Sequence, residues 1–298
     1  MFSWKNKKVL ITGVTGFVGA NLFKKLEELG ADTFGISRNL DITDFLKLND
    51  FVKKNKISIC FHLAAEALVE KGQNDPYQTF KTNIEGTFNI LESSRLNKLE
   101  RIVIASTAHV YGDNKAPYLE EYPPRPSRPY ETSKACADLI SQAYADTYDL
   151  PVLIPRFVNI YGPGDRNYNR LVPKTIISIL NGGKPKMWGG DAKRQYLYID
   201  DAIDAYIKLG EIDKTQIHKN RIYNFGEGYP ISVRDLIEKI IKLSGKNFNI
   251  EMIQEERPNE ISAQYVSSEK AKYYLNWLPK FSLDEGLLNT IEWYSRNK

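Results

Sequence analysis

A tyrosine and a lysine stand four residues apart in the segment Tyr130-Glu131-Thr132-Ser133-Lys134. On a helix, residues at this spacing share one face, so the phenol and the ammonium would lie close together. The nearby cation is expected to lower the pKa of Tyr130 from its ordinary value of about 10, because it favours the phenolate. Such a phenol can act as a general acid or base. Lys134 could also hold the ribose of a nicotinamide cofactor.

The same spacing recurs at Tyr77 and Lys81, so the spacing alone is not specific. Tyr130 follows a predicted strand that ends at Ile104-Ala105-Ser106-Thr107, whose hydroxyls can emerge at the carboxyl edge of a sheet. Ligands bind at that edge in doubly wound folds. Tyr77 instead follows Asn74-Asp75-Pro76, an ordinary helix start. The context therefore predicts a functional pair at Tyr130 and a structural pair at Tyr77.

Three glycines follow the first predicted strand, in the segment Gly13-Val14-Thr15-Gly16-Phe17-Val18-Gly19. Glycines at such a turn permit a tight bend, close approach of a pyrophosphate and close packing of the helix on the strand. The pyrophosphate then meets the free N–H groups and the positive end of the helix. The spacing is G-x-x-G-x-x-G rather than the commonest G-x-G-x-x-G. Its place between a strand and a helix predicts a dinucleotide site.

The end of the second predicted strand bears on the choice of cofactor. It reads Gly35-Ile36-Ser37-Arg38-Asn39, without the carboxylate that commonly grips the adenine ribose of NAD. Arg38 could pair with a 2′-phosphate, which slightly favours NADP over NAD. The alternative is that Arg38 is a solvated surface residue.

Short apolar strands alternate with amphipathic helices in the first half of the chain. This alternation predicts an α/β fold with a Rossmann-type, doubly wound parallel sheet. Pro and Gly become frequent from Tyr161, and two later helical patterns predict a smaller α/β substrate-binding lobe. We expect a dinucleotide-binding domain at 1–163 plus about 194–225, and a nucleotide-sugar-binding lobe at about 164–193 and 226–298. The predicted strands are 9–12, 33–37, 57–63, 101–106 and 152–157, and the predicted helices are 20–29, 84–96, 231–244 and 283–295.

The composition is that of a soluble globular protein, with 298 residues, 42% apolar and 26% charged, and a net charge of +4. No block of Lys and Arg predicts a nucleic-acid partner, and no apolar stretch approaches the roughly 18 residues of a membrane helix. Two cysteines offer neither a disulfide framework nor a metal spacing. The start of the chain lacks the pattern of a signal peptide, so we expect a cytoplasmic protein without a metal.

An ordered set of motifs resembles the extended short-chain dehydrogenase/reductase family, and more closely its nucleotide-sugar epimerases and dehydratases. The resemblance runs from about Lys8 to Tyr294, and it is more specific for the family than for the reaction. The motifs are Gly13–Gly19, Asp41-Ile42, His62-Leu63-Ala64-Ala65, Asn83-Ile84-Glu85-Gly86-Thr87, Thr107 with Val110-Tyr111-Gly112, Tyr130 with Lys134, and Arg156 with Asn159-Ile160-Tyr161-Gly162-Pro163-Gly164.

The resemblance implies an NAD(P) cofactor, a nucleotide-diphosphate sugar as substrate, and a catalytic triad of Thr107, Tyr130 and Lys134. The hydroxyl of Thr107 would bond the sugar oxygen at C4. Arginines would grip the diphosphate through charge-assisted bonds, and a tryptophan would stack on the base. The implied cofactor residues are Gly13, Gly16, Phe17, Val18, Gly19, Ser37, Arg38, Asp41, Ile42, Leu63, Ala64, Ala65, Asn83, Tyr130, Lys134 and Phe157. The implied substrate residues are Thr107, His109, Asn159, Arg170, Leu171, Trp188, Arg194 and Arg257.

The resemblance also implies a homodimer. Its subunits would join through the helices near Asn83–Asn97 and Glu131–Asp149, in a four-helix bundle.

One position departs from the pattern of the family's 4,6-dehydratases. These commonly carry an acid two residues before Val-Tyr-Gly, followed by a glutamate or lysine, and the two groups serve C6 and C5. Here the positions hold Ala108 and His109. Alanine cannot deliver a proton, which disfavours a dehydratase, although His109 or Glu66 could substitute.

The three histidines lead to different expectations. An imidazole at His109 could exchange protons with the sugar near neutral pH, or it could only shape the pocket by hydrogen bonding. His62 closes a strand and is predicted to be packed. His218 lies in a polar segment and is predicted to be on the surface.

These features favour an NAD(P)-dependent nucleotide-sugar 4-epimerase that acts through a transient 4-keto sugar. The alternatives are an NADPH-dependent reductase of a nucleotide-linked 4-keto-6-deoxy sugar and a 4,6-dehydratase. A cofactor sensor without catalysis is a further class, but it would not be expected to keep the Tyr130 and Lys134 pair. The sequence leaves the base and the sugar open.

Overall fold

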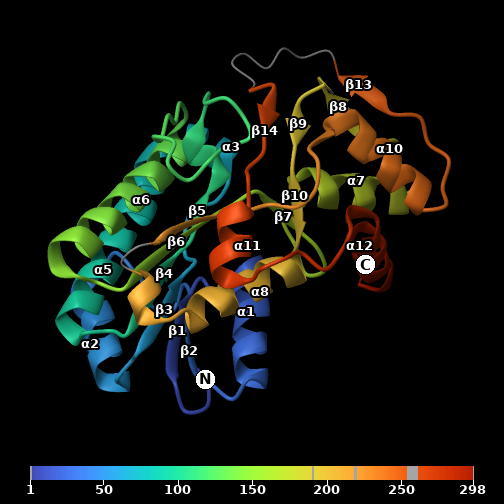
Figure 1. Cartoon of the computed structure of the whole chain (residues 1–298). Coiled ribbons are helices and arrows are strands. Elements are labelled where there is room, and N and C mark those ends of the chain that lie inside the picture. Colours follow the sequence, from blue (N-terminus) through green and yellow to red (C-terminus); the bar gives the residue numbers. More distant parts are fainter. Residues whose placement is uncertain (1, 190, 218–219, 254–260, 298) are drawn as a thin grey trace.

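A parallel sheet forms the centre of the molecule, which is described by a computed structural model for residues 2–189, 191–217, 220–253 and 261–297 (Figure 1). All pairings within this sheet are parallel. This confirms the predicted Rossmann-type sheet. In spatial order its strands are β2 (Asp32–Ile36), β1 (Lys8–Thr12), β3 (Ile59–His62), β4 (Arg101–Ile104), β6 (Val152–Phe157) and β11 (Ile222–Phe225), with β5 (Ser106–Thr107) also paired to β6.

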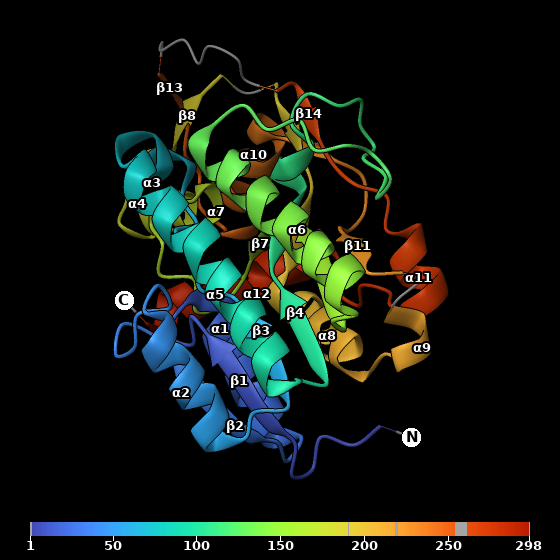
Figure 2. The ribbon, with the colours of Figure 1, turned by 90° about the vertical axis from the view of Figure 1, so that its left-hand side faces the viewer.

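Helices cover both faces of the sheet, which explains why its strands read as continuous apolar runs. In β1, Val9 and Ile11 pack into one core cluster, and Leu10 packs into the other. Figure 2 shows two of the covering helices, α5 and α6, lying side by side across one face. That face is covered by α2 (Phe45–Asn55), α5 (Gly86–Asn97) and α6 (Pro129–Tyr148), and the other by α1 (Phe17–Glu28) and α8 (Ile199–Glu211).

A smaller group of elements lies beyond the carboxyl edge of the sheet (Figure 1). It holds the helices α7 (Leu171–Leu180), α10 (Val233–Leu243) and α12 (Leu283–Arg296), which pack together. Short strand pairs join it: β7 (Asn159–Tyr161) with β10 (Tyr196–Tyr198), β8 (Lys186–Trp188) with β13 (Glu251–Ile253), and β9 (Lys193–Arg194) with both β12 (Ile231–Ser232) and β14 (Ala263–Gln264). The remaining elements are α3 (Val69–Asn74), α4 (Pro76–Phe80), a π-helix (Lys81–Glu85), a 3-10 turn (Ala108–Tyr111), α9 (Lys214–Ile217) and α11 (Glu269–Leu275).

The chain changes direction across the sheet at β1, which has β2 on one side and β3 on the other. Ligands of doubly wound folds bind outside the carboxyl ends of the strands at such a switch point. Gly13 follows β1 and Leu63 follows β3, so both predicted cofactor segments lie at this place.

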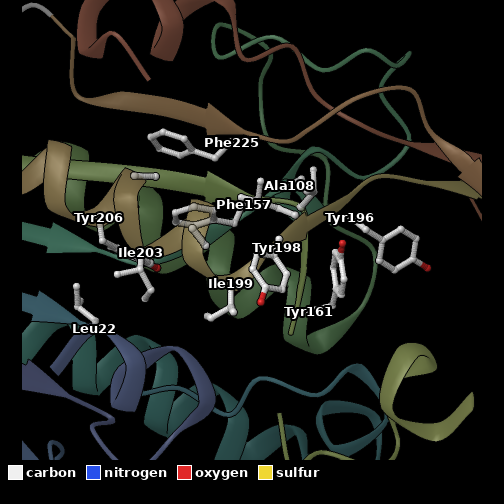
Figure 3. Close-up of a cluster of buried hydrophobic side chains, with 14 of the residues drawn as sticks. Leu22, Ala108, Phe157, Tyr161, Tyr196, Tyr198, Ile199, Ile203, Tyr206 and Phe225 are labelled. Carbon is white, nitrogen blue, oxygen red and sulfur yellow. The ribbon is translucent and has the colours of Figure 1, made fainter. Parts of the chain in front are cut away.

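An aromatic cluster joins the carboxyl edge of the sheet to the smaller lobe (Figure 3). The rings of Phe157 and Phe225 stack with centroids 4.9 Å apart, and Tyr206 packs 4.8 Å from Phe157. Tyr161 and Tyr198 continue the cluster with centroids 5.8 Å apart. This packing fixes the ends of β6 and β11 where the chain leaves the sheet.

Candidate active site

The three predicted catalytic residues gather at the carboxyl edge of the sheet. Tyr130 is the second residue of α6, and Thr107 ends β5. Thr107 Oγ1 accepts a hydrogen bond from the N–H of His109 at 3.3 Å, and Thr107 and Tyr130 line the same cavity. The ammonium of Lys134, one turn further along α6, donates a hydrogen bond to the carbonyl of Ala105. That carbonyl is available because the predicted strand 101–106 breaks at Ala105, between β4 and β5.

The prediction that Lys134 lowers the pKa of Tyr130 is wrong for this structure. Burial raises the pKa of Tyr130 above its ordinary value, and the charge of Arg170 and the hydrogen bond of Thr107 oppose that rise without reversing it. The ammonium is directed to Ala105 rather than to the phenol. Burial also lowers the pKa of Lys134 to about 8, against the opposing charge of Asp138.

A cavity of about 1320 Å³ opens in front of the catalytic residues, between the sheet edge and the smaller lobe. Drug-sized ligands occupy pockets of about 300–1000 Å³, so this one has room for a nucleotide-linked sugar. Arg257 and His218 lie outside the described residues. The structure brings these predicted residues to the cavity wall: Val18, Thr107, His109, Tyr130, Phe157, Asn159, Arg170, Leu171, Trp188 and Arg194.

Cationic side chains and one indole also line this cavity. Arg170 is paired with the buried carboxylate of Asp165 at 3.1 Å. The ammonium of Lys174 lies 4.1 Å from the centre of a Trp188 ring. Lys174 was not predicted, although it follows Arg170 by one helical turn. These cations, with Arg194, suit an anionic diphosphate next to an aromatic base.

The glycine turn fits a dinucleotide pyrophosphate. Gly13 has φ +73°, and a Cβ there would meet the amide nitrogen of Ala64 at 2.8 Å. A Cβ on Gly19 would overlap the carbonyl of Gly13, so only glycine lets α1 start this close to β1. The helix begins at Phe17 rather than at the predicted Ala20, and its N-cap, Gly16, offers no side-chain cap. The first N–H groups of α1 are therefore suited to a phosphate.

The segment after β2 is held by short polar side chains. The backbone N–H of Ser37 donates to Asn39 Oδ1 at 2.9 Å, and Arg38 is exposed. Asp41 accepts hydrogen bonds from the N–H and hydroxyl of Thr43, both at 2.9 Å. Ile42 is buried and packs directly against Gly86.

A hydrogen-bonded chain of buried groups positions the segment Leu63-Ala64-Ala65. The N–H groups of Leu63 and Ala64 donate to Thr12 Oγ1, both at 3.2 Å. His62 bonds Thr12 through Nδ1 at 2.8 Å and Thr87 through Nε2 at 3.1 Å. Burial, with the charge of Lys134, lowers the pKa of His62 to about 3, so the ring is neutral. His62 is 1% exposed, which confirms its predicted packing.

Asn83 lies in the π-helix, a distortion often found at functional sites. Its amide donates to the carbonyl of Glu66 at 3.0 Å and to Ser133 Oγ at 2.8 Å. Its Oδ1 accepts from the N–H of Glu66 at 2.8 Å. Asn83 therefore ties the segment after β3 to α6, beside the catalytic lysine.

Two acids near the catalytic residues were missed in the sequence. The carboxylate of Asp138 accepts hydrogen bonds from the guanidinium of Arg156 and the hydroxyl of Ser106, and its charge acts on Lys134. Glu131 is 2% exposed and lies 3.6 Å from His109. The sequence shows a charged residue directly after Tyr130, but it does not show that Glu131 lies beside His109 in the fold.

In the described ranges, no three histidine, cysteine, aspartate or glutamate side chains gather so that they could hold a metal ion. Among the same residues, no helix combines the length and apolar character needed to cross a membrane.

Comparisons with known proteins show the family of the chain. The model of the "NAD dependent epimerase/dehydratase family" matches residues 9–226. The UDP-glucuronate 4-epimerase of Thermodesulfobacterium geofontis is 30% identical over 97% of this chain and 96% of its own length. The solved structure of UDP-glucose 4-epimerase with UDP-glucose from Thermotoga maritima superposes with a TM-score of 0.91 at 26% identity, over 97% of this chain and 99% of its own.

A dehydratase is also similar. The structure of dTDP-glucose 4,6-dehydratase from Bacillus anthracis in complex with NAD has a TM-score of 0.84 at 26% identity, over 98% of this chain and 97% of its own. The family match spans more than half of the chain, from the glycine turn past the catalytic helix. The chain therefore belongs to the NAD dependent epimerase/dehydratase family, as an enzyme of the extended short-chain dehydrogenase/reductase type.

Proposed function

We propose that the protein is a nucleotide-sugar 4-epimerase that acts through a transient 4-keto sugar. The observation that carries this proposal is one cavity that is lined by Thr107 and Tyr130 and also by Arg170 and Trp188. Lys134 lies one helical turn from Tyr130 on α6. A C4 hydroxyl at Tyr130 and a diphosphate at the arginines would orient one sugar ring between them. Two 4-epimerases and a 4,6-dehydratase are similar to the chain at nearly the same identity, so the choice of epimerisation over dehydration rests on position 108.

The residues of the chain would bind the cofactor and move the proton. The turn Gly13–Gly19 would hold the pyrophosphate, Asp41 and Ile42 would contact adenine, and Leu63–Ala65 would line the cofactor. The nicotinamide supplies reversible two-electron oxidation at C4. Tyr130 would take the proton of the C4 hydroxyl and return it, while Thr107 holds the C4 oxygen. Lys134 would hold the ribose of the cofactor and stabilise the phenolate through its charge, for which its ammonium has to leave the carbonyl of Ala105.

Cofactor choice is a separate proposal. Arg38 is exposed at the end of β2, where it could reach a 2′-phosphate, and this favours NADP slightly. The family name and the NAD-bound dehydratase favour NAD. Calorimetry with both cofactors decides between them, and a clear preference for NAD removes the role given to Arg38.

The two alternative reactions differ in the product. Ala108 is buried in the core, so position 108 offers no acid to the sugar, which disfavours a 4,6-dehydratase. The test is incubation with UDP-, dTDP-, GDP- and CDP-sugars, with and without NAD(H) or NADP(H), followed by mass spectrometry and NMR. A 4-epimer keeps its mass, a dehydrated product loses water, and a reduced product gains two hydrogens. A panel without any 4-epimer would reject the proposal.

We also propose the homodimer and the division of the chain given by the sequence. Apolar side chains are exposed on α5 and α6: Phe88, Leu96, Leu139 and Tyr148. Figure 2 shows these two helices together on the outside of the molecule, where two copies could form a four-helix bundle. The division assigns 1–163 and about 194–225 to the cofactor, and about 164–193 and 226–298 to the sugar nucleotide.

A further inference from the structure

A buried tyrosine on α8 carries a hydroxyl that the fold itself does not use. Tyr206 is 2% exposed, and its ring packs 4.8 Å from that of Phe157 (Figure 3). The ring of Phe61 lies 6.2 Å away on the other side of the core. Within the described ranges, the Tyr206 hydroxyl has no hydrogen-bond partner. This is unusual, because the hydroxyl of a buried tyrosine normally finds one.

The position of this hydroxyl differs from that of a second core tyrosine. Tyr223 on β11 is 0% exposed, and its hydroxyl also lacks a partner in the described part of the chain. The Tyr223 hydroxyl is completely enclosed by protein, whereas that of Tyr206 is not. Tyr206 is one of the residues that line the cavity in front of the catalytic residues. Its hydroxyl therefore opens to this cavity.

The residues around Tyr206 are those expected beside the reactive ring of the cofactor. Val18 and Phe157, which the resemblance assigns to the cofactor, line the same cavity as Thr107 and Tyr130. The helix α8 packs on α1, which carries Val18. In the proposed function hydride leaves C4, so the ring that accepts it has to lie next to the C4 oxygen at Thr107 and Tyr130. The apolar side chains of Val18 and Phe157 suit such a flat ring.

The chemistry of the Tyr206 hydroxyl suits a neutral polar group. Burial raises the pKa of Tyr206, and the charge of Tyr130 raises it further. The phenol therefore stays neutral through the physiological range of pH, and it can both donate and accept a hydrogen bond. A carboxamide offers an acceptor oxygen and two N–H donors. The carboxamide is the hydrogen-bonding group of the nicotinamide ring.

We propose that the Tyr206 hydroxyl binds the carboxamide of the nicotinamide and so holds the ring beside Tyr130. This inference rests on one part of the proposed function, which is the place of the nicotinamide next to Tyr130. It adds a cofactor-binding residue that the motifs of the sequence did not indicate. In the sequence Tyr206 reads only as an apolar position of a helix, because the cavity that it reaches is formed by other elements.

The experiment is calorimetry of dinucleotide binding to the wild type and to Tyr206→Phe, a variant that lacks only the hydroxyl. The ligands are NAD, NADP and an analogue of each whose pyridine ring lacks the carboxamide. The natural dinucleotide that binds should bind Tyr206→Phe about two- to tenfold more weakly, as expected for one neutral hydrogen bond. Its carboxamide-free analogue should bind the two proteins equally. Tyr223→Phe is the matched control, because it removes the enclosed hydroxyl and should leave both affinities unchanged.

Three outcomes would overturn the inference. Equal losses for the dinucleotide and its analogue, or the same loss in Tyr223→Phe, would mean that the hydroxyl does not contact the carboxamide. An unchanged affinity of Tyr206→Phe for the natural dinucleotide would mean that the hydroxyl does not bind the cofactor. Loss of folding in Tyr206→Phe, measured by circular dichroism, would mean that the fold needs this hydroxyl.

The panel of sugar nucleotides separates the failure of this inference from that of the proposed function. A carboxamide-dependent loss in Tyr206→Phe without any 4-epimer from the wild type rejects the proposed function and leaves the inference standing. A 4-epimer without that loss overturns the inference alone. Absence of dinucleotide binding by the wild type overturns both.

Discussion

The carboxylate of Asp138 accepts two hydrogen bonds from the guanidinium of Arg156, at 2.8 and 3.0 Å, and both side chains are buried. A buried ion pair that loses one partner leaves an uncompensated charge. We therefore expect Arg156→Met to lower the free energy of unfolding by about 3–5 kcal/mol. The double variant with Asp138→Asn should recover part of this loss in urea unfolding. Equal stability of the single and double variants would contradict the prediction.

The catalytic assignment predicts a sharp contrast between two tyrosines that each precede a lysine by four residues. Tyr130→Phe removes the hydroxyl that exchanges the C4 proton, so turnover should fall about 10²–10⁴-fold. Tyr77 is 75% exposed on α4, and Tyr77→Phe should leave turnover unchanged. Steady-state rates with the preferred sugar nucleotide check both variants. Retention of activity in Tyr130→Phe would exclude the proposed mechanism.

Two glycines with nearly the same φ angle allow the cost of backbone strain to be measured apart from the cost of steric crowding. Gly13 has φ +73° and Gly182 has φ +76°, but only Gly13 has atoms within 4 Å of a Cβ. Gly182→Ala should cost about 1–2 kcal/mol of stability through the left-handed backbone alone. Gly13→Ala should cost more and should also weaken cofactor binding, because the Cβ pushes Ala64 away. Urea unfolding measures the loss of stability, and calorimetry measures cofactor binding. Equal losses of stability in the two variants would contradict the predicted crowding at Gly13.

His62 makes the stability of the protein depend on pH. Its folded pKa of about 3 lies below the ordinary value of 6.5, so the unfolded chain binds more protons between these limits. The stability due to a neutral His62 is complete above pH 6.5 and is lost as the pH falls toward 3. Its slope is at most about 1.4 kcal/mol per pH unit. His62→Gln should show a shallower decline in unfolding experiments between pH 6.5 and 4.5, and an unchanged slope would argue against the neutral ring.

The dimer proposal predicts which of two exposed leucines is needed for dimerisation. Leu139 lies on α6 and is 51% exposed, whereas Leu46 lies on α2 and is 78% exposed. Leu139→Glu would bury a charge in the proposed bundle and should yield monomers. Leu46→Glu should leave the mass in light scattering unchanged. A wild-type monomer, or a dimer that tolerates Leu139→Glu, would reject the interface.

Much of the sheet could be predicted because its strands are buried on both faces and read as apolar runs. The glycine turn was predictable as well, since the required conformations belong to glycine. The early start of α1 at Phe17 was not, because the helix includes Gly19, the last glycine of the turn. The break at Ala105 could not be read either, because β4 pairs with β3 and β6 whereas β5 pairs with β6, and the sequence does not show which strands are neighbours.

The same reason explains the missed members of the site. Glu131 reads as a surface residue of a helix, and its burial depends on His109 and Ser127 from other segments. Lys174 reads as a solvated charge, and its contact with Trp188 joins residues on two elements. The prediction for the pKa of Tyr130 was wrong because the sequence spacing showed the nearby lysine but did not show that Tyr130 is buried, which raises its pKa.

The strand β11 lies at the edge of the main sheet, although it follows β8, β9 and β10 in the chain. The helix α8, which precedes it, covers one face of the same sheet. A truncation after Tyr161 would therefore remove an edge strand and a covering helix of the main sheet, and it would expose apolar strands to water. A single cut of the chain therefore cannot release either half as an autonomous unit.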